Sequence, residues 1–426
     1  MSIRALPLRR AAVLRAKASM LAPVLALVGA VAIGGLGGCA STGGAVDKRI
    51  ALSPIRVVGE PVGPDALDVY DAEILFARGL DLLDGDAWSD AALYFERLVR
   101  EFPDDARVVL AHYNRGVAYI HLERGNDAVD AFDAYLALLP PTASKKDRLD
   151  GTFKRGQALA VAKRYEEVVT LFDELLGENL EPEDRIEALV DAGVGHYMLG
   201  LRPGGEEMHR PTSEYRFLEA RRIYKKESEK RRIDHLQFFV AQASFYLGEL
   251  ARLEFNELKL TIPSAKDIEE RKQRRPEAGL EALLGEQLEE KCQRLLRAQY
   301  AYLRTIREGD AGWASAAGFS VGQMYEDLHH EMVNLPPPED LTTEQSSIYR
   351  QLVRRKVLIL LEKAEKTWSQ TAEMVTRTGA ESEWAQRTRE SLNRVHDRIV
   401  AEAAATADLD DDRDAVAGAG GASGSS

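Results

Sequence analysis

Ser320 is the side chain whose neighbours most suggest covalent chemistry. Gly318 and Gly322 flank it, and small flanking residues permit a tight turn that exposes a serine hydroxyl for nucleophilic attack. Asp327 and His330 follow it, so an acid and a base come after the nucleophile in the chain. The apolar pattern of this segment predicts a helix, however, and on one helix Ser320 and His330 would lie about 15 Å apart. A hydrogen-bonded triad therefore does not form.

The string Gly318-Phe319-Ser320-Val321-Gly322 resembles the nucleophile elbow of α/β-hydrolases, which implies a serine hydrolase. That elbow joins a strand to a helix, whereas this string falls inside a predicted helix, with Gly322 at the glycine position of a repeat described below. We therefore expect no catalytic residue and no enzyme, and we keep serine hydrolysis only as a remote alternative.

Metal and cofactor chemistry find little support in the sequence. His329-His330-Glu331 is not the H-E-x-x-H zinc motif, and neither a glycine-rich phosphate loop nor a paired metal-ligand spacing occurs. His112 and His121 are expected on helix surfaces or in packing contacts. We expect no metal, no cofactor and no small-molecule substrate.

The two cysteines, Cys39 and Cys292, lie in different settings. Cys292 belongs to an apolar helical stripe, which predicts a small buried side chain. The other members of the stripe are Leu288, Leu295, Leu296, Leu303 and Ile306. Cys39 lies within an uncharged stretch, residues 18–46, that follows five basic residues. A basic segment followed by an apolar one predicts export.

The segment Leu36-Gly37-Gly38-Cys39 resembles the lipobox of bacterial lipoprotein signals. The resemblance implies that residues 1–38 are a signal peptide, that Cys39 receives a diacylglyceryl thioether, and that acyl chains attach the protein to a membrane. The alternative is an uncleaved transmembrane anchor, although the glycines that close the stretch weaken such a helix. Ala40 replaces the aspartate that retains such lipoproteins in the inner membrane. We therefore expect a lipid anchor in the outer membrane, with the body in the periplasm.

Composition predicts an acidic folded body between two unstructured ends. The 426 residues carry a net charge of −13, which becomes −18 without the five basic residues of the signal. This charge opposes nucleic-acid binding, because cationic side chains supply most of that affinity. Residues 39–66 mix glycine, serine, threonine and proline, which is typical of a flexible tether. Residues 404–426 are acidic and then rich in glycine and serine, which predicts disorder.

Self-similarity dominates the remaining chain. Alanine, phenylalanine and proline follow Gly79 at offsets of 12, 16 and 24, and they follow Gly116 at identical offsets. A weaker copy begins at Gly156. Later segments align on three more glycines: Gly193, Gly248 and Gly322. The pattern resembles the tetratricopeptide repeat, a helix-turn-helix unit of about 34 residues.

This resemblance implies an all-α superhelix of about six helix pairs with a C-terminal capping helix. We expect regular repeats over residues 67–182 and divergent helical repeats with insertions over residues 183–403. The expected insertions are Leu201–Thr212, Glu257–Gly285 and Asn334–Asp340. Long helical patterns over Thr343–Thr378 and Glu381–Ala403 would close the array.

The position three residues before each repeat glycine is aromatic in most copies. The series reads Phe76, Tyr113, Phe153, Val190, Phe245 and Phe319. In the tetratricopeptide family, the first helix of each repeat (helix A) lines a concave groove that binds peptides or partner helices. The resemblance therefore implies that the five aromatics are partner-binding anchors. The alternative is that they pack between helices.

A basic run interrupts the acidic body. Between Arg221 and Arg232, seven arginines and lysines stand against two glutamates. The run predicts either a solvated helix face or a surface for electrostatic docking to lipid phosphates or an acidic partner. The docking candidates are Arg221, Arg222, Lys225 and Lys226.

The combination of lipobox and repeats resembles lipoproteins of the β-barrel assembly machine and the repeat lipoproteins of envelope-spanning motility or secretion machines. The resemblance implies a membrane-anchored periplasmic scaffold that binds another cell-envelope protein or peptide in its groove. The alternative is an envelope protein that binds peptidoglycan or another polysaccharide, although no carbohydrate-binding module is visible.

Overall fold

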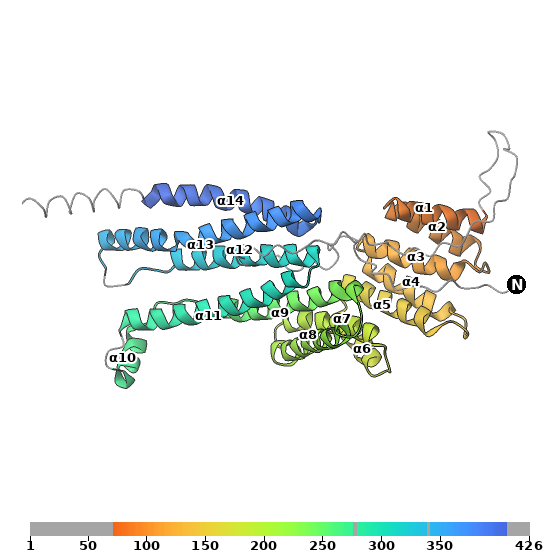
Figure 1. Cartoon of the computed structure of the whole chain (residues 1–426), viewed down its shortest axis with the longest axis horizontal. Helices are drawn as coiled ribbons and strands as arrows, with labels where there is room; N and C mark the ends of the chain where they lie inside the picture. The colour runs from red at the N-terminus through yellow and green to blue at the C-terminus, as the bar shows by residue number, and fades with distance from the viewer. Residues whose placement is uncertain (1–70, 276–278, 339–340, 407–426) are drawn as a thin grey trace, which may run out of the picture. The chain divides into compact units, whose positions relative to one another are not determined.

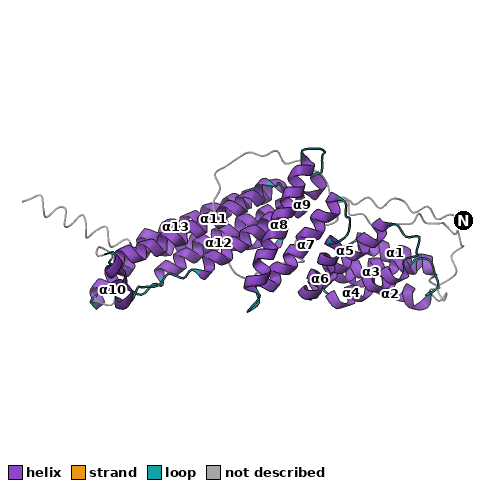
Figure 2. Ribbon diagram, turned by 90° about the horizontal axis from the view of Figure 1, so that it is seen from below, coloured by secondary structure: helices purple, strands orange, loops and turns teal. Residues whose placement is uncertain are grey.

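The computed structural model describes residues 71–275, 279–338 and 341–406. Across these ranges the regular structure comprises fourteen α-helices, one short 3-10 helix and no strand (Figures 1 and 2). The described residues divide into two compact units, 71–239 and 240–406. The predicted all-α class is confirmed. The division between the units falls inside a helix, whereas we placed the change in repeat character after residue 182.

Unit 1 is built from four helix pairs in which each helix packs on the next one along the chain. The helices are α1 (Ala72–Asp84), α2 (Trp88–Glu101), α3 (Val108–His121), α4 (Gly125–Leu138), α5 (Lys145–Val161), α6 (Tyr165–Leu176), α7 (Pro182–Gly200) and α8 (Glu206–Ser228). The first helices of neighbouring repeats, α1, α3, α5 and α7, also contact one another in order. Such neighbour-to-neighbour stacking is typical of helical repeat arrays.

The described residues of unit 2 form six α-helices. They are α9 (Gln237–Glu257), α10 (Ala265–Arg274), α11 (Leu280–Arg307), α12 (Ala311–Val333), α13 (Thr343–Thr378) and α14 (Glu383–Thr406). Helix α12 packs against α11, α13 and α14, and α13 packs against α14. The last helix therefore closes this unit, as the predicted capping helix does.

Each repeat glycine lies against an aromatic ring of the second helix in its pair (helix B). A methyl group built on any of these glycines would lie less than 3 Å from that ring, so the ring occupies the space that a side chain would fill. The contacts are Gly79 with Phe95, Gly116 with Phe132, Gly156 with Phe172, Gly193 with Phe217, Gly248 with Tyr302 and Gly322 with Trp368. They join α1 to α2, α3 to α4, α5 to α6, α7 to α8, α9 to α11 and α12 to α13. The predicted six helix pairs are confirmed.

Local sequence signals set several helix ends. Asp71 caps α1, because its carboxylate accepts a hydrogen bond from the Ile74 amide at 2.8 Å. Thr342 and Gln345 form a reciprocal capping box at the start of α13. The same helix ends at Gly379, which has a φ of 66°, a left-handed conformation that glycine adopts without strain. The expected helix over Thr343–Thr378 is therefore reproduced residue for residue.

Two of the three expected insertions contain more helix than the sequence suggested. The first, Leu201–Thr212, is a five-residue turn followed by the start of α8, which continues through Pro211. A proline this close to a helix start interrupts few hydrogen bonds. The second insertion contains α10, which begins with a capping box of Ser264 and Asp267. The third separates α12 from α13, as predicted.

Candidate interaction surface

The aromatic residues expected to line a groove are instead part of the helix-pair cores. Phe76, Phe153, Phe245 and Phe319 are all buried. Their ring centroids lie 5.8 Å from Phe95, 5.7 Å from Phe172, 5.7 Å from Tyr302 and 6.2 Å from Trp368, respectively. A residue three positions before the glycine lies on the same side of helix A as the glycine, so both face the same ring of helix B. The assignment of these four residues as accessible anchors is wrong, and the packing alternative is correct.

The remaining two members of the series follow the same arrangement. Val190 is fully buried. Tyr113 is half-buried, and its ring makes edge contacts with Phe132 at 5.6 Å and Tyr135 at 5.1 Å. Tyr113 therefore packs within its helix pair. The other aromatics of the series are buried, so they do not extend the exposed part of the Tyr113 ring.

The Ser320 string lies inside the continuous helix α12, as its repeat position predicted. Ser320 is buried, and Gly322 lies against the Trp368 ring, so this segment does not form an elbow. Burial raises the pKa of Asp327 to about 6, opposed by a hydrogen bond from Gln323. Within the described ranges, no group of three histidine, cysteine or acidic side chains is arranged to hold a metal ion.

Both histidines expected in packing or surface positions occupy such positions. His112 is buried, and burial lowers its pKa to about 4, with a further contribution from Arg115. The ring of His121 stacks on Trp88 with a centroid distance of 3.6 Å.

Cys292 is exposed, and the prediction that it is buried is wrong. The buried face of α11 follows Lys291, Leu295, Ala298 and Tyr302. Because a helix turns by about 100° per residue, Cys292 and its apolar neighbours at four-residue spacing lie beside this face and not within it. The apolar stripe in the sequence therefore combines a buried row with an exposed row.

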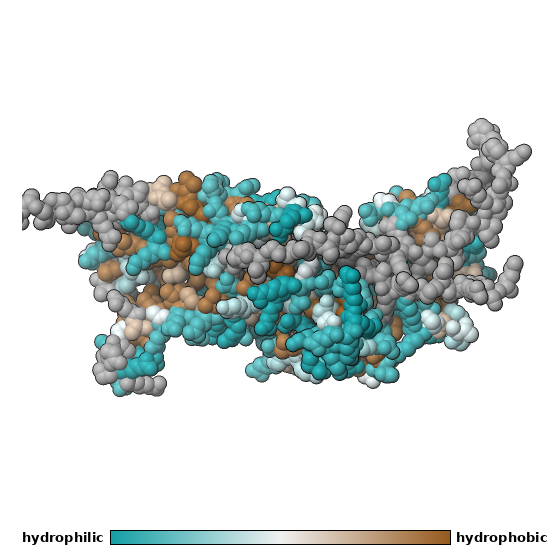
Figure 3. Space-filling model, in the orientation of Figure 1, coloured by the Kyte–Doolittle hydropathy of each residue, from teal (hydrophilic) through white to brown (hydrophobic). Residues whose placement is uncertain are grey.

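Exposed apolar residues also occur on a second helix of unit 2, α13. Leu296 and Tyr300 on α11 are 47% and 67% exposed. On α13, the exposed fractions are 51% for Ile348, 43% for Leu352 and 50% for Ile359. We call these five residues the α11–α13 surface. Figure 3 shows apolar side chains gathered over the region of α11, α12 and α13. Exposed apolar area of this extent marks interaction sites on many soluble proteins.

Tyr325 of α12 lies between the two helices that carry this surface. Burial raises the pKa of its hydroxyl, and a hydrogen bond with Gln299 of α11 opposes that rise. From α13, the ammonium of Lys363 lies 5.4 Å from the centroid of the Tyr325 ring. Helices α11 and α13 therefore flank α12 on either side, with Tyr325 buried between them.

Helix α13 is also rich in basic residues. From Ile348 to Lys366 it contains six basic residues and two glutamates. Lys356 is exposed and lies four residues after Leu352, which places it on the same side of the helix. This surface therefore combines apolar contacts with positive charge, a combination suited to a partner that carries apolar and acidic side chains.

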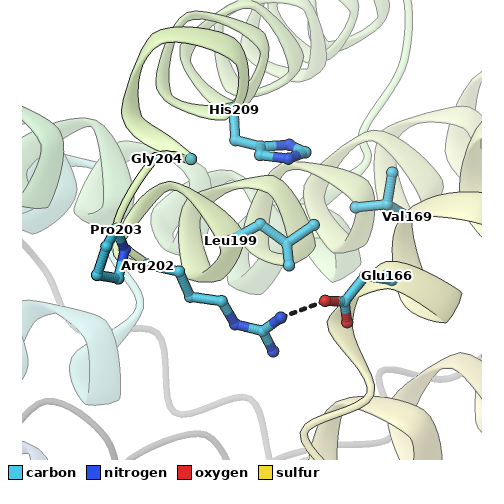
Figure 4. A pocket seen from close by; sticks show the side chains of 8 residues that line it. Glu166, Val169, Leu199, Arg202, Pro203, Gly204 and His209 are labelled. Carbon is cyan, nitrogen blue, oxygen red and sulfur yellow. Dashed lines mark hydrogen bonds and ion pairs between the residues drawn. The ribbon is translucent and has the colours of Figure 1, made fainter.

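A separate shallow pocket of about 350 Å³ lies in unit 1 (Figure 4). It is lined by Glu166, Val169, Leu199, Arg202, Pro203, Gly204, Gly205 and His209. Arg202 forms an ion pair with Glu166 across the pocket. The Nδ1 atom of His209 lies 2.9 Å from Nδ1 of His196. Since these polar groups are engaged with one another, the pocket offers no evident ligand site.

His196, which contacts the pocket residue His209, belongs to a polar cluster. Its Nε2 atom is 3.6 Å from Asp173, which also forms an ion pair with Arg216 at 2.7 Å. Burial lowers the pKa of His196, and Asp173 opposes that change, while His209 and Arg216 reinforce it. The cluster joins α6, α7 and α8.

The predicted basic run occupies the end of α8 and the residues after it. Arg222 pairs with Glu219 at 2.6 Å, and Arg231 pairs with Glu183 of α7 at 2.9 Å. Part of the run therefore stabilises the helix surface. Lys225 and Lys226 are exposed, whereas Arg221 is half-buried.

Cys39, the predicted lipidation site, lies outside the described residues, as do the predicted signal peptide and tether. Among the helices of the described residues, none combines the length and the apolar character that a membrane span requires.

No known family model and no curated protein sequence matches this chain. Among solved structures, one similar chain is a Rap protein complexed with Competence and Sporulation Factor. It is 14% identical, and the alignment covers 78% of this chain and 76% of that chain with a TM-score of 0.34. A tetratricopeptide repeat protein from Parabacteroides merdae is 14% identical, with coverages of 75% and 98% and a TM-score of 0.32. The P58(IPK) TPR domain is 14% identical, and the alignment covers 78% of this chain and 99% of that chain with a TM-score of 0.23. The assignment to a tetratricopeptide-like fold rests on the six glycine–aromatic helix pairs.

Proposed function

We propose that this protein is a lipid-anchored scaffold that holds another envelope protein on its α11–α13 surface. The observation that carries the proposal is the set of five large apolar side chains on α11 and α13 of unit 2, each 43–67% exposed. Leaving so much apolar area in water is unfavourable, by about 25 cal/mol for each Å² that a partner could cover. The surface is therefore suited to binding a partner and replaces the groove that the aromatic series suggested.

The chemistry of the surface defines the partner segment. Leu296 and Tyr300 on α11 and Leu352 on α13 supply apolar contacts. Lys356 on α13 adds positive charge beside Leu352. A helix or extended segment that alternates apolar residues with carboxylates would complement both features.

The membrane anchor in this proposal is supported by the lipobox-like segment that ends at Cys39 and by the basic and uncharged residues before it. The periplasmic location follows from the same export signal. The outer-membrane destination follows from Ala40. The scaffold and its anchor are separate claims, and different experiments test them.

Introducing carboxylates into the apolar α11–α13 surface is expected to abolish recovery of the partner protein. Substituting Tyr300→Asp together with Leu352→Asp places two carboxylates where apolar contact is required. Truncating one anchor typically costs about 2 kcal/mol, roughly thirtyfold in affinity, and the double change should exceed this. The measurement is affinity capture from solubilised membranes followed by quantitative mass spectrometry of the co-purified envelope protein.

The matched control for this experiment is Leu93→Asp together with Leu138→Asp. Leu93 on α2 is 58% exposed and Leu138 on α4 is 48% exposed, both in unit 1, so the control adds the same two charges to exposed apolar positions. It should leave recovery unchanged, and all variants should keep the wild-type melting temperature. Equal recovery with the double variant and the wild type would rule out this surface as the binding site.

Cys39→Ser is expected to remove all lipid from the protein, because the thioether requires the sulfur atom. The measurement is incorporation of a clickable fatty acid in cells, followed by separation of membrane and soluble fractions. Cys292→Ser is the natural control, since the chain has only these two cysteines. That variant should keep full label and remain in the membrane fraction. Lipid label that persists in the Cys39 variant would refute the anchor.

A further inference from the structure

Helix α8 presents an outward face that neither the fold nor the proposed scaffold role explains. Met208, Tyr215 and Leu218 are 66%, 60% and 46% exposed. Their spacings of seven and three residues place them on one side of the helix. The same side continues into the exposed Arg222 and Lys226. One face of a single helix is therefore apolar over its first half and cationic over its second.

The opposite face fixes this orientation. Phe217 is fully buried and lies against Gly193 of α7. Ser213 is also buried, and its hydroxyl donates a 2.8 Å hydrogen bond to the carbonyl oxygen of Gly193. Because both contacts fix the orientation of α8 against α7, the outward face cannot turn toward the core unless these contacts are lost.

Helix electrostatics account for only part of this face. Cations near a helix C-terminus interact favourably with the helix dipole, and Arg222 is paired with Glu219. Neither effect explains why Met208 and Tyr215, about two turns or more before those cations, are left in water on the same side. Apolar residues joined to lysines and a tyrosine are typical of helices that lie at a membrane surface.

We infer that the outward face of α8 binds the surface of a phospholipid membrane that contains anionic lipids. The apolar half enters the boundary between headgroups and acyl chains, and Lys225 and Lys226 contact lipid phosphates. The charge supports this occupant, since the region is basic while the whole chain carries −13. The inference does not depend on acylation of Cys39.

The test uses residues 40–426, which keep every described helix and lack the proposed signal and lipid. Co-sedimentation with vesicles of phosphatidylglycerol and phosphatidylcholine measures binding at low salt. Lys225→Glu with Lys226→Glu is expected to lower the partition coefficient at least tenfold, because two attractions become repulsions. High salt should weaken wild-type binding, since ions screen the contacts. Met208→Ser with Leu218→Ser should also weaken it, through the lost apolar contact.

A matched control separates this face from general charge. Lys266→Glu with Lys272→Glu changes the net charge equally at two exposed lysines of α10, and it should leave binding unchanged. No wild-type binding to anionic vesicles, or equal binding to purely neutral ones, would refute the proposal. So would a loss of partner capture in the α8 variant without any loss of vesicle binding, which would assign the face to a protein. Tyr300→Asp with Leu352→Asp should not affect vesicle binding, so the scaffold proposal and this one can fail separately.

Discussion

Trp368→Ala is expected to reduce the free energy of unfolding of unit 2 by about 3–5 kcal/mol, the range typical of large buried aromatic residues. Trp368 is fully buried, and its ring fills the space above Gly322. Its indole Nε1 also donates a 3.1 Å hydrogen bond to the carbonyl oxygen of Phe319. The substitution removes the contacts of this ring between α12 and α13 and leaves that carbonyl without this donor. Urea unfolding followed by circular dichroism measures the change.

Tyr300→Ala provides the comparison for this experiment. Tyr300 is also a large aromatic residue of unit 2, but it is 67% exposed, so its truncation should change the unfolding free energy by less than about 1 kcal/mol. Similar losses from both substitutions would show that the ring over Gly322 is not what holds the pair together.

Glu331→Ala is expected to cost about 3–5 kcal/mol, because it leaves a buried ammonium without its counter-ion. Lys291 is 1% exposed. Its ammonium lies 2.9 Å from the Glu331 carboxylate and donates to the carbonyl oxygens of Phe255 and Leu258. The other Glu331 oxygen accepts a 2.6 Å hydrogen bond from the Leu260 amide. The pair therefore fastens the segment after α9 to both α11 and α12.

The pH dependence of this variant distinguishes lost charge pairing from lost packing. Burial lowers the pKa of Lys291, and the Glu331 carboxylate opposes that change. Without the carboxylate the folded-state pKa should fall further below its value of 10.5 in the unfolded chain. The unfolded state then binds the extra proton, so stability rises with pH between the two pKa values. Adding Lys291→Met to Glu331→Ala should restore much of the stability at pH 7. A loss that is independent of pH and not relieved by the double substitution would contradict this account.

The sequence predicted the helix pairs well because their packing depends on one residue type at one spacing. Only glycine leaves room for the ring of helix B, so Gly79 and Gly116 reveal the pairing without knowledge of distant contacts. The prediction was weaker where local signals conflict. Pro211 and the glycines before it suggested a loop, yet α8 begins at Glu206. Helix α10 was missed, although the capping box of Ser264 and Asp267 was readable in the sequence.

The candidate surface was harder to predict, because the exposure of a side chain depends on which helices pack around it. The spacing of Phe153 and Phe245 from their glycines showed which face of the helix they share, but not that helix B covers that face. The apolar residues of α13 illustrate the converse. Ile359 is exposed although Val357 and Leu361, two residues to either side, are buried. Two apolar rows on one helix look alike in a sequence, and only the packed partner tells them apart.

The glycine-to-ring contact also bears on how the chain can reach its fold as it is made. Each contact in unit 1 joins two successive helices, so a pair can close once its second helix is available, without waiting for later residues. Folds dominated by local contacts of this kind have low contact order and form quickly. The N-terminal pairs can therefore cover their apolar faces while the rest of the polypeptide is still emerging, which shortens the time during which those faces are open to aggregation.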